Sequence, residues 1–75
     1  MNVSDVMIHI NEPLSEDAQL VLEDRMREID GVISPRFNPG RDHLMMVAFN
    51  PDVAHCDMLL AKVREAGFTA QMVGL

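Results

Sequence analysis

Residues 32–49 read VISPRFNPGRDHLMMVAF, and this stretch decides the fold. Two segments, Val32 to Phe37 and Leu44 to Phe49, have the length of strands. Between them, Asn38-Pro39-Gly40-Arg41-Asp42 is a strong turn signal, because proline fixes φ and glycine accepts a positive φ. The stretch therefore predicts a β-hairpin.

The segment before the hairpin predicts a strand and then a helix. Val6, Ile8 and Ile10 alternate with Met7 and His9, which is the period-two pattern of a strand with two distinct faces. Asn11-Glu12-Pro13-Leu14 breaks this strand.

Ser15 is placed as the N-cap of the first helix, with Glu16 and Asp17 in the first turn, where the helix dipole favours negative charge. Gly31 is placed as a left-handed cap after the last turn. The residues expected on the apolar face of this helix are Ala18, Val21, Leu22, Met26 and Ile29.

The segment after the hairpin repeats the pattern. Asn50-Pro51-Asp52 stops the second hairpin strand, and Gly67 closes a second helix, with Phe68 packing back on its last turn. Gln71 to Leu75 is long enough for one more strand. The residues expected on the apolar stripe of the second helix are Cys56, Leu59, Leu60, Val63 and Ala66.

The order strand, helix, strand, strand, helix, strand predicts an α+β fold. Right-handed crossovers place both helices on one face of a four-stranded antiparallel sheet. This is the ferredoxin-like βαββαβ sandwich with strand order 4-1-3-2. We expect residues 1–75 to form one domain.

Composition and net charge argue against several classes of protein. The net charge of −6 would repel phosphate, so no nucleic-acid partner is expected. No apolar run approaches the roughly 20 residues that span a membrane. The chain does not start with a basic region and an apolar stretch, so no secretory signal is expected. The single cysteine, Cys56, agrees with a cytoplasmic location.

Three segments carry a resemblance to a known family. Residues 26–32, MREIDGV, resemble a helix exit that usually reads Leu-x-x-Leu-Pro-Gly-Val. Residues 47–51, VAFNP, resemble a strand exit of the form Val-x-Tyr/Phe-Asp-Pro, and residues 59–68, LLAKVREAGF, resemble a closing helix ending in Ala-Gly-Tyr. In joint register, these segments resemble a heavy-metal-associated domain, the small fold of copper chaperones and of modules of metal-pumping ATPases.

The resemblance implies a Cys-x-x-Cys loop, in which two thiolates hold a soft metal ion such as Cu(I). Counted back from Gly31, those positions carry Ser15 and Ala18, and neither side chain is a soft ligand. Pro13 stands where the family has a methionine. Thiolate metal capture at the usual place is therefore not expected, and no cofactor is expected.

Catalytic signals are weak, and we expect no enzyme. Cys56 is expected in the core, because free cysteine is among the most buried residue types. His55 and Cys56 point about 100° apart on a helix, and no third group is evident to orient the imidazole. His43 is expected to be a solvated turn residue. Asp52, Asp57 and Glu65 are expected to serve as a capping residue and as solvated surface residues.

The strand patterns leave one partly apolar sheet face without a helix. Three interpretations of this face are open: a protein contact surface, an unusual His/Met copper site, or an RNA-binding platform. An RNA platform would need stacking aromatic residues on the two central strands, and the face carries none. We favour a small non-enzymatic interaction domain that self-associates as a homo-oligomer or docks to a protein partner, through the free sheet face or an edge strand. The alternative is copper-type ion binding through His, Met or Cys ligands. The face consists of Met7, His9, Leu44, Met46 and Ala48.

Overall fold

Six elements follow one another in the predicted order. The computed structural model describes residues 2–73. Both hairpin strands have the predicted bounds, and the last strand begins one residue earlier than predicted, while its predicted end at residues 74 and 75 lies outside the described residues. The elements are β1 (Ser4–Ile10), α1 (Glu16–Arg27), β2 (Val32–Phe37), β3 (Leu44–Phe49), α2 (Cys56–Glu65) and β4 (Ala70–Val73).

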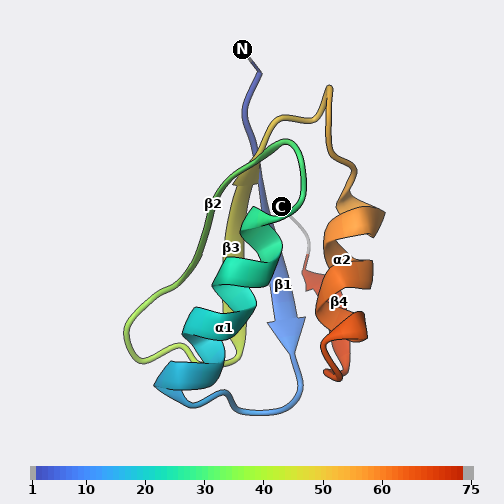
Figure 1. Ribbon diagram of the computed structural model, residues 1–75. Coiled ribbons are helices and arrows are strands. Elements are labelled where there is room, and N and C mark those ends of the chain that lie inside the picture. The colour runs from blue at the N-terminus through green and yellow to red at the C-terminus, as the bar shows by residue number, and fades with distance from the viewer. Residues whose placement is uncertain (1, 74–75) are drawn as a thin grey trace.

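The four strands form one antiparallel sheet in the order β2-β3-β1-β4, which is the predicted 4-1-3-2 read from the other edge. Both helices lie on the same side of this sheet (Figure 1). The predicted ferredoxin-like sandwich is therefore confirmed, with β1 and β3 as its two central strands.

The core lies between the helices and the inner face of the sheet. Alternate residues of β1 and β3 are buried, as the period-two pattern predicts. The helices contribute one stripe each, so a single apolar cluster joins both layers. Its largest fully buried side chains include Ile8, Ile10, Leu22, Met26, Met45, Val47, Leu59 and Val63.

A side-chain cap fixes the start of α1, and a glycine shapes the turn that follows it. The hydroxyl of Ser15 accepts a hydrogen bond from the Ala18 N–H at 3.2 Å, which confirms the predicted N-cap of α1. Gly31 was predicted to cap α1, but the helix ends at Arg27 with Glu28 as its C-cap, so Gly31 lies three residues further on; it takes a positive φ of +96°, and its carbonyl oxygen accepts from the Asn50 N–H at 2.7 Å. The turn after α1 is thereby tied to the end of β3.

One prediction about α1 is wrong. Val21 was expected on the apolar face, but 56% of its surface is exposed, whereas Leu22 and Met26 are buried. Successive helical residues point about 100° apart, so Val21 faces outward once the stripe through Leu22 and Met26 packs on the sheet.

Candidate functional site

The five residues predicted on the free sheet face do lie together. Met7 pairs with Met46 across the two central strands, His9 with Leu44, and Asp5 with Ala48. Directly paired residues of an antiparallel sheet project from the same face. Each of the five is half-buried, while their neighbours along the strand are buried on the helix side.

The same register extends this face to the outer strands. Arg36 of β2 pairs with Met46, and Val73 of β4 pairs with Met7, so one row of side chains crosses all four strands. Within residues 2–73, Asp5 and Arg36 are the charged side chains that the pairing assigns to this face, so the surplus of acidic residues lies elsewhere. We call this surface the sheet face; its residues are Asp5, Met7, His9, Ser34, Arg36, Leu44, Met46, Ala48, Gln71 and Val73.

His43 lies in the predicted turn just before β3, with its side chain partly exposed, and its ring also contacts the sheet face. It is half-buried, and its ring stacks on that of His9 with centroids 5.9 Å apart and an interplanar angle of 11°. The Nδ1 atom of His43 lies 2.8 Å from the Ile10 carbonyl oxygen, which can only accept, so Nδ1 carries a proton and donates. Its Nε2 atom lies 3.9 Å from the Asp42 carboxylate.

Within residues 2–73, a buried side-chain atom without a hydrogen-bond partner is found at His9. Its Nδ1 atom is buried and has no hydrogen-bond partner among the residues that the structure describes. Buried polar atoms are paired in most native proteins, so this ring nitrogen is an exception among the described residues.

The two edges of the sheet are less open than its face. Pro35 lacks an N–H, and the Phe37 N–H, on the same side of β2, donates to the Glu23 carboxylate at 3.0 Å. On β4, the Ala70 carbonyl accepts from the Arg64 guanidinium at 2.9 Å. Side chains therefore occupy or remove backbone groups that an added strand would need.

The place where the sequence resemblance implies a metal loop holds no metal-binding arrangement. Ser15 uses its hydroxyl to cap α1, and Ala18 packs against the core. No group of three or more His, Cys, Asp or Glu side chains that could hold a metal ion occurs within residues 2–73. The residues present do not fit a thiolate-bound ion at this place.

Cys56 was expected in the core, and this prediction is wrong, because it is exposed. It is the first residue of α2, and the stripe that reaches the core begins one turn later, at Leu59. His55 is the N-cap residue of α2 and makes no side-chain cap bond, so the expected capping role of Asp52 is not found either.

Comparisons with known proteins bear on the fold. No protein-family model matches the sequence, and no curated protein matches it. The chain is similar to the N-terminal domain of a potential copper-translocating P-type ATPase from Bacillus subtilis in its Cu(I)-loaded state, with 20% identity, a TM-score of 0.85, and coverage of 97% of this chain and 90% of that one.

Two further solved structures have the same architecture. Oxidized MerP from Ralstonia metallidurans is 11% identical with a TM-score of 0.85, covering 97% of this chain and all (100%) of that one. A CopZ metallochaperone is 16% identical with a TM-score of 0.78, covering 93% of this chain and 100% of that one. The resemblance to heavy-metal-associated domains is thereby confirmed for the fold.

The helices give no sign of a membrane segment. Across residues 2–73, none combines the length and the apolar character needed to cross a bilayer.

Proposed function

We propose that this chain is a non-enzymatic protein-binding module that keeps the fold of heavy-metal-associated domains and has lost their thiolate metal capture. It docks through the sheet face, and the occupant is a second copy of the chain. The observation that carries the proposal is the half-buried, methionine-rich surface around Met7 and Met46, on the side of the sheet away from both helices.

The chemistry of the sheet face supports a protein contact. Methionine side chains are flexible and adapt to a partner surface, and an apolar sheet face without a covering layer is a liability for a monomer. The blocked edges support the same conclusion, since strand addition would need backbone groups that Pro35, Glu23 and Arg64 have removed or occupied.

The charge distribution supports a second copy as the occupant. The chain carries a net charge of −6, which would oppose self-association if the acidic groups faced each other. The sheet face instead offers one acid, Asp5, and one base, Arg36. A two-fold interface places the same patch on both sides, so a patch with both signs can complement itself. A cytoplasmic location goes with this proposal, because a single free thiol suits a reducing compartment.

Analytical ultracentrifugation over a range of concentrations tests the proposal. The wild-type protein is expected to approach the mass of a dimer, and Met46→Lys is expected to be monomeric, because the lysine places a charge in the centre of the interface. Met58→Lys is the matched control, since Met58 is 43% exposed on α2, away from the sheet face.

Two outcomes would count against it. A wild-type monomer at every concentration would remove the second copy as the occupant. A dimer that both lysine variants weaken equally would show that the contact does not involve the sheet face.

A second candidate function is the binding of a copper-type ion through non-standard ligands. The orphaned Nδ1 of His9 and the stacked His43 ring favour it, and thioether sulfur such as that of Met46 is a soft ligand. The geometry of the two histidine rings argues against a metal site. The rings of His9 and His43 are nearly parallel, so their nitrogen lone pairs do not point at one ion, which would need nitrogen ligands at about 2.0 Å. This second candidate function predicts Cu(I) affinity that falls in His9→Leu and Met46→Leu, and unchanged affinity in both variants would dismiss this site.

A further inference from the structure

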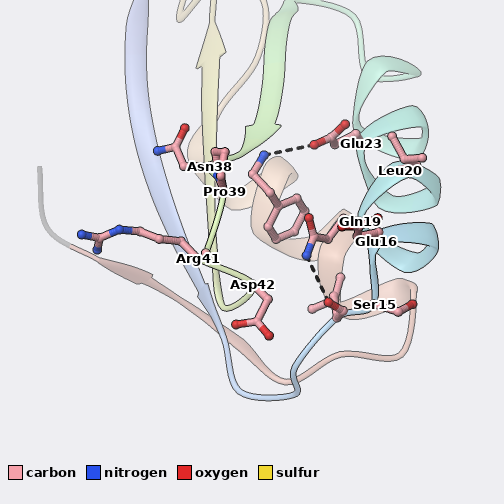
Figure 2. Close-up of a pocket in the computed structure, with 12 residues that line it drawn as sticks. Ser15, Glu16, Gln19, Leu20, Glu23, Asn38, Pro39, Arg41 and Asp42 are labelled. Atoms are coloured by element: carbon pink, nitrogen blue, oxygen red, sulfur yellow. Dashed lines mark hydrogen bonds between the residues drawn. The ribbon is translucent and has the colours of Figure 1, made fainter.

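A cleft of about 680 Å³ lies between α1 and the turn that joins β2 to β3 (Figure 2). Its size is within the range of about 300–1,000 Å³ that is usual for ligand pockets. It lies on the helix side of the sheet, so it is separate from the sheet face, and its lining includes Ser15, one of the positions where the sequence resemblance implies a metal loop.

Apolar side chains supply part of its lining. Leu14 is buried to 4% exposure and Phe37 is half-buried, and Pro39 adds a rigid ring from the turn. Leu20 stands at the α1 wall with 60% of its surface exposed. Such a lining would pack well against the methylene stem of a long side chain.

Carboxylates dominate its charged groups. Glu16 and Glu23 come from α1 and Asp42 from the turn, against one guanidinium, Arg41. In Figure 2, the Arg41 side chain extends away from α1, so it does not neutralise that wall. The positive end of the α1 dipole is already offset by the Ser15 cap and by first-turn acids.

One of these carboxylates is held in place before any ligand arrives. An oxygen of Glu23 accepts the Phe37 N–H at 3.0 Å, and only 14% of the Glu23 side chain is exposed. Its other oxygen is 4.0 Å from Arg27, which is bound more closely to Asp24 at 2.8 Å. Glu23 is therefore already engaged within the protein, while Glu16 and Asp42 are exposed and open to a ligand.

We propose that this cleft binds an arginine or lysine side chain presented by a basic segment of a partner protein. The stem of that side chain would lie on Leu14 and Phe37, and its charged end would meet the carboxylates of Glu16 and Asp42. Charge complementarity decides the occupant, because a cation gains from the exposed carboxylates of Glu16 and Asp42 while an anion would be repelled. The proposal goes beyond the sheet face and does not depend on it.

The test is a titration of the full chain, followed by amide chemical shifts, with the blocked peptide Gly-Arg-Leu-Arg-Gly. The shifts are expected at α1 and the β2–β3 turn, and they should weaken as salt is added. The double variant Glu16→Gln/Asp42→Asn is expected to raise the Kd by about fivefold, the factor that two exposed ion pairs supply. The matched control is Asp57→Asn/Glu65→Gln, which removes the same charge from exposed positions of α2.

Three results would overturn the proposal: equal weakening by both double variants, equal binding of a peptide with citrulline in place of arginine, or shifts confined to the sheet face. Repeating the titration in Met46→Lys separates the two proposals, because loss of self-association leaves the cleft intact. Binding that persists in that variant supports the cleft whatever the oligomeric state.

Discussion

Gly31 lies between α1 and β2 and packs closely against the loop that follows β3. A Cβ at this position would lie 2.9 Å from the Cβ of Val53 and 3.0 Å from the backbone nitrogen of Ala54, which is fully buried. Both the positive φ of +96° and the close approach of the neighbouring loop therefore require glycine.

Gly31→Ala is expected to destabilise the protein more than Gly67→Ala. Gly67 has nearly the same φ of +99°, but a Cβ added there would meet nothing within 4 Å, so its substitution measures the backbone term alone, about 1–2 kcal/mol. The free energies of unfolding from urea denaturation give the comparison. Equal losses in the two variants would mean that the loop moves aside without cost.

Single residues were also where prediction from the sequence failed. Cys56 is apolar in type and fits helical spacing, but it begins α2, and the first turn lies beyond the edge of the core. His43 lies in the turn as predicted, but the pattern did not predict that its ring stacks on His9, held there by the hydrogen bond from its Nδ1 atom to the Ile10 carbonyl. Neither outcome follows from the local pattern, since both depend on contacts between distant segments.

At the scale of elements, α1 depends on Ser15, the N-cap residue directly before its first turn. Ser15 occupies one of the positions where the family resemblance implies a cysteine, and its hydroxyl satisfies the Ala18 N–H. The residue therefore has a structural role that a thiol would perform less well, because sulfur is a weak acceptor.

Ser15→Ala is expected to lower the free energy of unfolding by about 1 kcal/mol, since an unsatisfied first turn frays. Ser15→Asp keeps an acceptor at the same place and adds charge that the helix dipole favours, so it should remain close to the wild type. Thermal or urea unfolding followed by circular dichroism measures both. No loss in Ser15→Ala would show that the cap contributes nothing here.

The elements themselves could be predicted from residue patterns. The alternation of Val6, Ile8 and Ile10 predicted the two faces of β1. The turn at residues 38–42 predicted where β2 ends and where β3 begins. Glu12, by contrast, lies in a loop without a pattern, and its carboxylate accepts the Thr69 N–H at 2.8 Å, a bond that lowers the pKa of Glu12. Such links between loops escape sequence reasoning because the partners are far apart in the chain.

At the scale of the whole molecule, the sheet and the helix layer present two candidate binding surfaces, the sheet face and the cleft beside α1. The sheet face was within reach of prediction, because strand alternation and strand order together determine which residues share it. The cleft was not, since its walls come from α1 and from a turn that only the packed structure brings together. Fold and function are separable: the chain shares the fold of the solved structures it resembles, and it carries Ser15 and Ala18 where the sequence resemblance implies cysteines.

The most direct measurement is a titration of the reduced wild-type protein with Cu(I) against a competing chelator. The variant Ser15→Cys/Ala18→Cys serves as the positive control, because it restores two thiols at the positions that the family resemblance implies. We expect the wild type to leave Cu(I) with the chelator, and the double variant to withdraw it with a stoichiometry of about one ion per chain or per pair of chains. Tight stoichiometric binding by the wild type would contradict the loss of metal capture and would make His9, His43 and Met46 the first ligands to replace.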